Sequence, residues 1–99
     1  MIKAGIYGAT GYAGAELTKI LSTHSEVDII FAASKTYAGK YLNSIHPHAP
    51  NILLQDTDKV DLQKADLVFL CLPSSSGMHI AVDALKEGVK VIDLSADFR

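Results

Sequence analysis

The first third of the chain consists of two apolar runs separated by a helical pattern. The run Ile2–Tyr7 is mostly apolar rather than alternating, which predicts a parallel strand that is covered on both faces. A helix is predicted from about residue 12 to about residue 23, and its apolar face consists of Ala13, Leu17, Ile20 and Leu21. The next apolar run, Val27–Ala33, predicts a second strand, so residues 2–33 form a βαβ unit with a right-handed crossover.

The middle of the chain loses this regularity. Polar residues, Gly and Pro accumulate between Ser34 and Pro50, which predicts a loop with a short helix around Tyr41–Ile45. We expect a short strand at Ile52–Leu54, followed by a turn and a weak helix within Gln55–Asp66.

The last third returns to a strand, a helix and a strand. Leu67–Leu72 is the clearest central strand of the chain, and Pro73–Ser76 ends it and supplies N-cap candidates for a helix that runs to about Glu87. The apolar face of this helix is predicted to consist of Ile80, Ala81, Ala84 and Leu85. Gly88 stands where a helix commonly ends, and Val89–Leu94 predicts another buried strand.

This order of elements predicts an α/β fold with a doubly wound parallel sheet, the Rossmann type of nucleotide-binding domain. Ligands bind to such sheets beyond the carboxyl ends of the strands, at the point where the strand order reverses. Four segments rich in Gly, Ser, Thr or basic residues follow the predicted strands, namely Gly8–Gly14, Ser34–Tyr37, Pro73–Ser76 and Ser95–Arg99. The functional edge of the sheet is predicted to lie there.

A glycine turn stands between the first strand and the first helix, and its sequence is Gly-Ala-Thr-Gly-Tyr-Ala-Gly. Gly8 allows a tight turn, Gly11 lets a pyrophosphate approach the backbone, and Gly14 lets the helix pack close to the strand. The first N–H groups of the helix and the positive end of its dipole then face the phosphates. The spacing G-x-x-G-x-x-G is a variant of the G-x-G-x-x-G found in typical NAD enzymes, and it predicts dinucleotide binding.

The end of the second strand predicts which dinucleotide is bound. NAD-preferring domains place an Asp or Glu there, which bonds the ribose hydroxyls. Here Ser34, Lys35 and Thr36 follow the strand without a carboxylate. A hydroxyl and an ammonium group both bond a 2′-phosphate, which a carboxylate would repel. The sequence therefore predicts NADP, and the alternative is that Lys35 is a solvated surface charge.

Composition restricts the partners and the compartment. The 99 residues suffice for one small domain, and a net charge of −2 argues against nucleic acid or an anionic membrane as the main partner. No apolar run approaches the roughly 20 residues of a membrane-spanning helix, and we expect no leader peptide before the first strand. One cysteine excludes an internal disulfide framework, so we expect a reducing, cytoplasmic environment.

The sequence favours structural roles over catalysis or metal binding for Cys71, His46 and His48. Cys71 lies within an apolar strand, which predicts core packing rather than a nucleophile. His46 and His48 stand in a Pro-containing loop with no third ligand at a recognisable spacing. Loop packing or hydrogen bonding is therefore favoured over a metal site, and we expect no metal.

Five stretches of the chain point to a family when they are taken together. They are Gly8–Gly14, Ser34–Lys40, His46–His48, Leu72–Pro73 and Asp93–Arg99. The chain resembles N-acetyl-gamma-glutamyl-phosphate reductases, NADPH-dependent enzymes of arginine biosynthesis that are related to aspartate-semialdehyde dehydrogenase. The resemblance covers all 99 residues, and its most specific parts are Tyr-Ala-Gly-Lys and Ser-Ala-Asp-Phe-Arg.

The resemblance implies a reaction and a set of contacts. Enzymes of this family reduce N-acetyl-glutamyl 5-phosphate to the 5-semialdehyde and release phosphate; a cysteine thiolate attacks, NADPH reduces the thioester, and a histidine is the acid and base. The residues that it implies for the pyrophosphate are Gly8, Thr10, Gly11, Tyr12, Ala13 and Gly14. It also implies Ser34 and Lys35 for the 2′-phosphate, Leu72, Pro73 and Ser74 for the nicotinamide side, and Arg99 for the substrate phosphate.

The resemblance places the family's catalytic cysteine and histidine, and its catalytic and dimerisation domain, after residue 99. Residues 1–99 are therefore expected to be the truncated cofactor-binding domain of a homo-oligomeric enzyme, with no catalytic residue and no activity of their own. The implied partner is a small acyl phosphate. Two alternatives stay open, a non-catalytic NADP-binding regulator and aspartate-semialdehyde dehydrogenase, although Ser34–Lys40 argues against the second.

Overall fold

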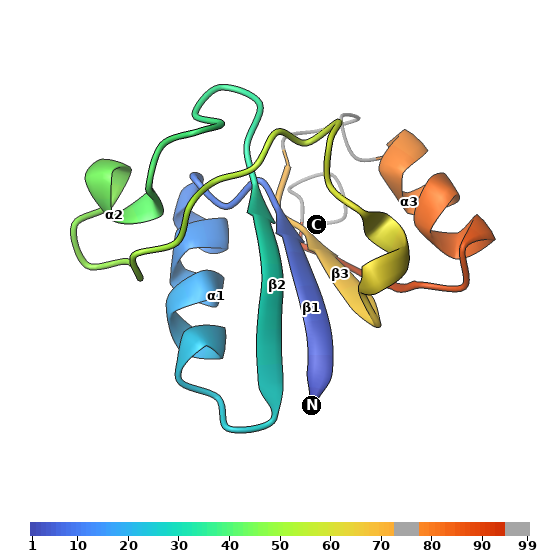
Figure 1. Ribbon diagram of the computed structural model, residues 1–99. Coiled ribbons are helices and arrows are strands. Elements are labelled where there is room, and N and C mark those ends of the chain that lie inside the picture. Colours follow the sequence, from blue (N-terminus) through green and yellow to red (C-terminus); the bar gives the residue numbers. More distant parts are fainter. Residues whose placement is uncertain (73–77, 95–99) are drawn as a thin grey trace.

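Four parallel strands form one sheet in the part of the chain that the structure describes, residues 1–72 and 78–94 (Figure 1). The computed structural model has the strand order β2-β1-β3-β4. The strands are β1 (Ile2–Tyr7), β2 (Val27–Ala33), β3 (Leu67–Leu70) and β4 (Lys90–Asp93). Because β2 lies on one side of β1 and β3 on the other, the strand order reverses between β1 and β3. This is the doubly wound parallel sheet that the sequence predicted.

Helices cover both faces of this sheet (Figure 1). The helices on one face are α1 (Tyr12–Ser22) and the short α2 (Leu42–Ile45), and those on the other are α3 (Met78–Lys86) and the 3-10 helix η1 (Leu62–Lys64). Gly88 follows the end of α3 with a φ of +75°, the left-handed conformation expected of a glycine there. The N-cap serines predicted for this helix, Ser74–Ser76, lie outside the described residues.

Each face of the sheet has its own core, because successive side chains of a strand point to opposite faces. The core on the α1 side consists of Ile6, Ala9, Leu21, Ala32, Leu42 and Leu54. The core on the α3 side consists of Tyr7, Phe31, Ala33, Ala65, Val68, Leu70, Ile80, Ala84 and Val89. The interior strands β1 and β3 are therefore apolar on both faces, although Ile2 at the start of β1 is exposed.

The predicted apolar face of α1 is partly wrong. The buried residues of this helix are Gly14, Ala15, Thr18 and Leu21. Ala13 is exposed, and Ile20 is 56% exposed. The helix turns Gly14 toward the sheet because a residue without a side chain allows the closest approach. Thr18 can be buried beside it because its hydroxyl donates a hydrogen bond of 2.7 Å to the Gly14 carbonyl oxygen.

Two predictions of burial near the C-terminus are also wrong. In α3, Ile80 and Ala84 are buried as predicted, but Leu85 is 66% exposed. In β4, Ile92 is 44% exposed, and Leu94, which was predicted to belong to this strand but follows it, is also exposed. The reason is that β4 is an edge strand of the described sheet and has β3 as its neighbour on one side.

The prediction of a short strand at Ile52–Leu54 is wrong. Isolated β-bridges hold the long connection between β2 and β3 in its place. Leu53 pairs with Tyr41 in antiparallel orientation, and Gln55 pairs with Ala33 in parallel orientation. The hydrogen bonds from Ser34 N to Gln55 O and from Gln55 N to Ala32 O are both 2.9 Å long. This connection therefore runs directly beside the carboxyl end of β2.

Candidate functional site

The turn after β1 is packed against the ends of both neighbouring strands. Gly8 has a φ of +76°, and a Cβ atom at this position would lie 2.6 Å from the carbonyl oxygen of Cys71. The N–H groups of Gly8 and Ala9 both donate to the carbonyl oxygen of Ala33, over 3.0 and 3.2 Å. The turn therefore joins the carboxyl ends of β1, β2 and β3 at the point where the strand order reverses.

The other two glycines of the turn differ in the space around them. A Cβ atom on Gly14 would overlap the carbonyl oxygen of Gly8 and would lie 2.9 Å from the Cα atom of Ala9. A Cβ atom on Gly11 would meet the Gly8 carbonyl oxygen at 3.7 Å, an ordinary contact, and Gly11 has a φ of −73°. Packing among the described residues thus requires glycine at position 14 but not at position 11.

The first turn of α1 presents N–H groups without an acceptor inside the helix at this edge of the sheet. Gly11 is the N-cap residue and offers no side chain to the helix, whose first bond runs from Ala15 N to Gly11 O over 2.9 Å. The N–H groups of residues 12–14 have no intrahelical acceptor at a helix start. Tyr12 is 91% exposed and Ala13 is exposed, so this helix end is accessible. An anion is the ligand that such an end favours.

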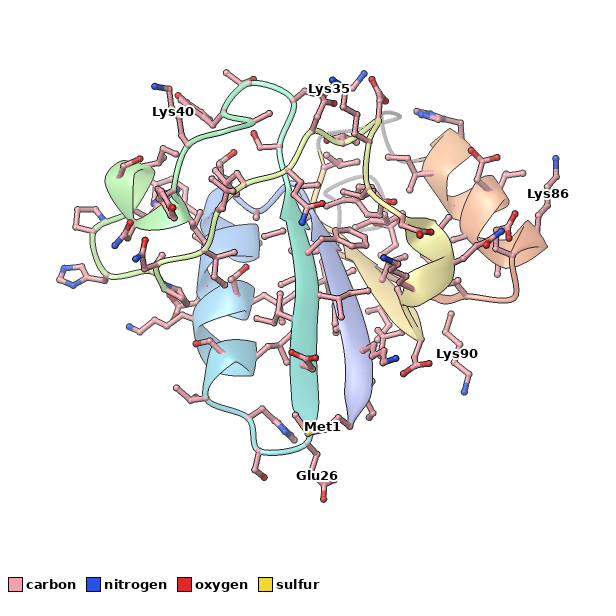
Figure 2. All side chains as sticks on the ribbon, in the orientation of Figure 1. Met1, Glu26, Lys35, Lys40, Lys86 and Lys90 are labelled. Carbon is pink, nitrogen blue, oxygen red and sulfur yellow. The ribbon has the colours of Figure 1, made fainter. Side chains whose placement is uncertain are left out.

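The end of β2 places a hydroxyl and an ammonium group on the same edge. Ser34 is buried, and its hydroxyl oxygen accepts the Tyr37 N–H over 3.1 Å, which leaves the hydroxyl hydrogen for another acceptor. Lys35 is exposed, and Figure 2 shows it with Lys40 at the end of the molecule opposite Met1 and Glu26. This is the end at which β1 and β2 finish.

A carboxylate that the sequence reasoning missed lies beside Lys35. The Nζ atom of Lys35 is 3.5 Å from a carboxylate oxygen of Asp58, and the two side chains are 65% and 66% exposed. The sequence reasoning for NADP considered only the residues that directly follow β2. Asp58 comes from the β2–β3 connection, which Gln55 ties to the end of β2. No local sequence signal connects Asp58 with Lys35.

The segment after β3 borders the glycine turn. The N–H of Cys71 donates to the carbonyl oxygen of Tyr7 over 3.0 Å, and Leu72, the next residue, is half-buried. Leu72 is thus brought to the same edge as Gly8. Pro73, Ser74 and Arg99, which the family resemblance implied for the nicotinamide side and the substrate phosphate, lie outside the described residues.

The one cysteine has the surroundings of a core residue. Cys71 packs against the core on the α1 side. Burial, with a smaller contribution from the negative charge of Asp93, raises the pKa of its thiol from 9.0 to about 11. Because the thiolate is the reactive form, this thiol is a poor nucleophile near neutral pH.

His46 contacts the glycine turn from the β2–β3 connection. Its Nε2 atom lies 2.5 Å from the carbonyl oxygen of Thr10, and its ring centroid lies 6.0 Å from that of Tyr12. The prediction of loop hydrogen bonding for this histidine is confirmed. Its partner could not be foreseen, because α1, β2 and α2 separate Thr10 from His46 in the sequence.

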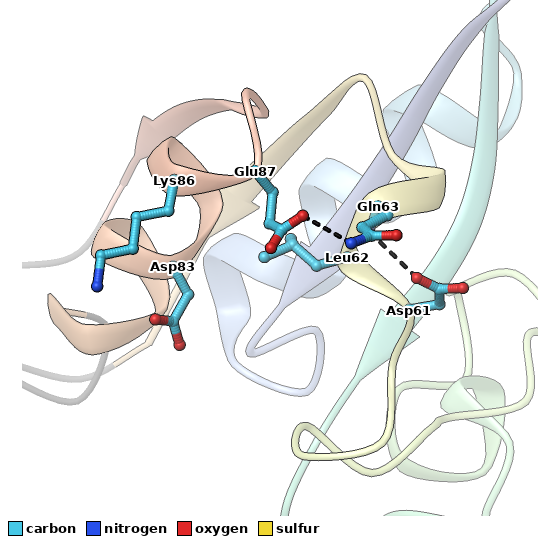
Figure 3. Close-up of a pocket in the computed structure, with 6 residues that line it drawn as sticks. All are labelled: Asp61, Leu62, Gln63, Asp83, Lys86 and Glu87. Atoms are coloured by element: carbon cyan, nitrogen blue, oxygen red, sulfur yellow. Dashed lines mark hydrogen bonds between the residues drawn. The ribbon is translucent and has the colours of Figure 1, made fainter.

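A groove of about 500 Å³ lies between η1 and the end of α3 (Figure 3). Its lining residues are Asp61, Leu62, Gln63, Asp83, Lys86 and Glu87. The side-chain amide of Gln63 donates to the Glu87 carboxylate over 2.7 Å, and its backbone N–H donates to the Asp61 carboxylate over 3.2 Å. Three carboxylates and one ammonium group disfavour the phosphates of a dinucleotide, so the groove is not a candidate for that ligand.

Residues 1–72 and 78–94 contain neither a membrane-spanning helix nor a cluster of metal ligands. No helix in these ranges is both long and apolar enough to cross a membrane. The same ranges contain no group of three or more His, Cys, Asp or Glu side chains that could hold a metal ion.

Comparison with known proteins agrees with this geometry. The family model described as "Semialdehyde dehydrogenase, NAD binding domain" matches residues 3–99. The chain is 45% identical to N-acetyl-gamma-glutamyl-phosphate reductase of Thermoanaerobacter pseudethanolicus, over 100% of the chain and 30% of that protein. It is 44% identical to a putative LysW-L-2-aminoadipate/LysW-L-glutamate phosphate reductase of Pyrococcus abyssi, over 100% of the chain and 29% of that protein.

Solved structures share the fold. Aspartate semialdehyde dehydrogenase with NADP from Candida albicans superposes with a TM-score of 0.80 at 22% identity, over 99% of the chain and 30% of that protein. Aspartate semialdehyde dehydrogenase II from Vibrio cholerae gives a TM-score of 0.80, also at 22% identity, over 99% and 29%. The chain thus spans about 30% of the length of the proteins that it matches.

Proposed function

Because the chain belongs to the semialdehyde dehydrogenase NAD-binding domain family, we propose that it binds NADP(H) for the reduction of an acyl phosphate to an aldehyde. The proposed substrate is N-acetyl-glutamyl 5-phosphate, in line with the names of several reductases that the chain resembles. Since the chain spans about 30% of their length, the proposal concerns a whole enzyme to which these 99 residues contribute the cofactor site.

The observation that carries the proposal is the open first turn of α1 beside the hydroxyl and ammonium groups at the end of β2. Among the described residues, and apart from the chain neighbours of Gly11, the Gly8 carbonyl oxygen at 3.7 Å is the one atom within 4 Å of a Cβ atom built on Gly11. A pyrophosphate placed there would meet the N–H groups of residues 12–14. Ser34 and Lys35 stand at the next strand end, where the adenosine ribose of a dinucleotide lies in this fold.

The bound cofactor would supply a hydride, and the residues of this chain would bind and orient it. The first-turn N–H groups of α1 would hold the pyrophosphate, and Ser34 Oγ and Lys35 Nζ would bond the 2′-phosphate. Leu72 would line the nicotinamide side, together with Pro73 and Ser74. We expect the thiol that accepts the acyl group to be a residue other than Cys71, because Cys71 packs against the core on the α1 side and burial raises the pKa of its thiol to about 11.

A second acyl phosphate should be assayed in parallel, because one relative is named for a different substrate. The Pyrococcus abyssi relative is named for LysW-linked aminoadipate and glutamate phosphates. Measuring the oxidation of NADPH by the intact protein with each acyl phosphate separates the two substrates. Reaction with the LysW-linked compound alone would refute our substrate proposal.

The cofactor proposal is tested by titrating the intact protein with NADPH and with NADH at a fixed salt concentration. The variant is Lys35→Ala, which removes the proposed partner of the 2′-phosphate. Its matched control is Lys40→Ala, an exposed lysine of the same segment and the same end of the molecule (Figure 2). We expect NADPH to bind more tightly than NADH, and we expect this preference to shrink in Lys35→Ala but not in Lys40→Ala.

Two results would contradict the proposal. Equal affinities for NADPH and NADH would leave the family and the fold in place but would refute the assignment of NADP. Absence of binding to a protein that unfolds cooperatively would refute the assignment of the carboxyl edge as the dinucleotide site.

A further inference from the structure

His46 is held in place by its backbone. Leu42, at the start of α2, is fully buried in the core on the α1 side, and its N–H donates to the Ile52 carbonyl oxygen over 2.8 Å. The N–H of His46 donates to the Leu42 carbonyl oxygen over 3.0 Å, and the His46 carbonyl oxygen accepts the Ala49 N–H over 2.9 Å. Both backbone polar groups of His46 are thus bonded, so the direction of its side chain is constrained.

The side chain of His46 contacts the glycine turn. The Nε2 atom is 2.5 Å from the carbonyl oxygen of Thr10, and the imidazole is tilted by 60° against the Tyr12 ring. A carbonyl oxygen only accepts hydrogen bonds, so Nε2 is the donor and carries the hydrogen. Both His46 and Thr10 are half-buried, which limits the water that could replace this contact.

The contact restrains one peptide unit of the turn at both of its ends. The Thr10 carbonyl and the Gly11 N–H belong to the same planar, trans peptide. The carbonyl oxygen accepts from His46, and the N–H donates to the Gly8 carbonyl oxygen over 3.3 Å. The orientation of this peptide determines where the next N–H groups, those of residues 12–14, point.

We propose that His46 is a positioning residue for the pyrophosphate of the cofactor. By donating Nε2–H to Thr10, it holds the Thr10–Gly11 peptide so that the first turn of α1 presents its N–H groups to the phosphates. This inference rests on the proposed function, because it assumes that a dinucleotide lies at the turn. His46 acts through the backbone of the turn and takes no part in the chemical step.

Three variants and two ligands test the inference in the intact protein. His46→Leu removes the donor at similar volume, whereas His46→Gln offers an amide N–H at about the reach of Nε2. His48→Gln is the matched control, an exposed histidine in the same loop. The ligands are NADPH and adenosine 2′-phosphate, which keeps the phosphate assigned to Ser34 and Lys35 but lacks the pyrophosphate. Thermal unfolding of each variant checks that it is folded.

We expect His46→Leu to bind NADPH about fivefold more weakly, the loss that corresponds to one neutral hydrogen bond. Adenosine 2′-phosphate should bind to it within about twofold of the wild type. His46→Gln should restore most of the affinity for NADPH, and His48→Gln should leave it unchanged. A merely structural role of His46 would weaken both ligands together.

Three results would overturn the inference while the proposed function stands, provided that the wild type binds NADPH. They are an unchanged NADPH affinity in His46→Leu, an equal weakening of both ligands, and a His46→Gln variant as weak as His46→Leu. A wild-type protein that binds no NADPH would refute the proposed function and this inference with it.

Discussion

Replacing two glycines of the same turn, one at a time, should separate folding from ligand binding. In Gly14→Ala the new Cβ atom would overlap the Gly8 carbonyl oxygen and would lie 2.9 Å from the Ala9 Cα atom. Both neighbours are backbone atoms that cannot rotate away, so α1 must shift. Overpacking of this kind costs about 1–3 kcal/mol of the free energy of unfolding, or more where the backbone is rigid.

Gly11→Ala should leave that free energy almost unchanged. Its φ of −73° and ψ of 168° are open to alanine, and the Cβ contact of 3.7 Å is ordinary. Alanine is a poorer N-cap than glycine, which costs up to about 1 kcal/mol. The lower chain entropy of the unfolded state offsets this by about 0.4–1 kcal/mol. The free energy of unfolding should therefore change by less than about 1 kcal/mol.

The affinity for NADPH should fall more in Gly11→Ala than in Gly14→Ala, which is the reverse of the effect on the free energy of unfolding. The methyl group that Gly11→Ala introduces would occupy the open side of the turn and would keep a pyrophosphate from the N–H groups of residues 12–14. Losing a hydrogen bond to a charged group costs about 1.5–3 kcal/mol, which corresponds to a loss of affinity of about 10- to 150-fold.

Thermal unfolding and calorimetric titration with NADPH, applied to both variants and the wild type, measure the two effects separately. For a domain of this size, 1 kcal/mol corresponds to a shift in Tm of about 4–8 °C. The reasoning is refuted if Gly11→Ala is destabilised as much as Gly14→Ala, or if Gly11→Ala binds NADPH like the wild type.

Two further predictions follow from the side chains around the site. Asp58→Asn should strengthen NADPH binding by up to about fivefold and leave NADH binding nearly unchanged, because an exposed pair such as Lys35–Asp58 contributes about 0.2–1 kcal/mol. Titrations at about 0.1 M and about 1 M salt check this, since the gain should disappear at the higher concentration; a gain that persists there would contradict it. Alkylation of Cys71 with iodoacetamide should rise with a midpoint near pH 11 in the native protein and near pH 9.0 in denaturant. Because the folded-state pKa is the higher one, the free energy of unfolding should fall as the pH rises through this range, and coincident alkylation midpoints would refute the assignment.

Local sequence features predicted most of the helices and strands and the place of the glycine turn between β1 and α1. The apolar runs at Ile2–Tyr7 and Val27–Ala33 became strands with those bounds, because hydrophobic periodicity is a property of consecutive residues. The glycine turn was recognisable because its residues are contiguous and lie between a strand and a helix. The same reasoning misplaced the buried face of α1, where Gly14 and Thr18 face the sheet in place of Ile20. Hydrophobicity alone does not show that a glycine is needed for close approach.

The folded chain brings distant side chains together at that site. Asp58 lies beside Lys35, and His46 lies against Thr10, because the β2–β3 connection returns over the carboxyl ends of β1 and β2. This connection has no hydrophobic period, so its path depends on the burial of Leu42 and Leu54 and on isolated bridges. Short-range patterns in the sequence predicted a parallel sheet and the glycine turn after β1. Only the tertiary structure placed the Asp58 carboxylate beside Lys35 and the His46 imidazole beside the Thr10 carbonyl oxygen. Such contacts depend on distances in space, which no local sequence pattern encodes.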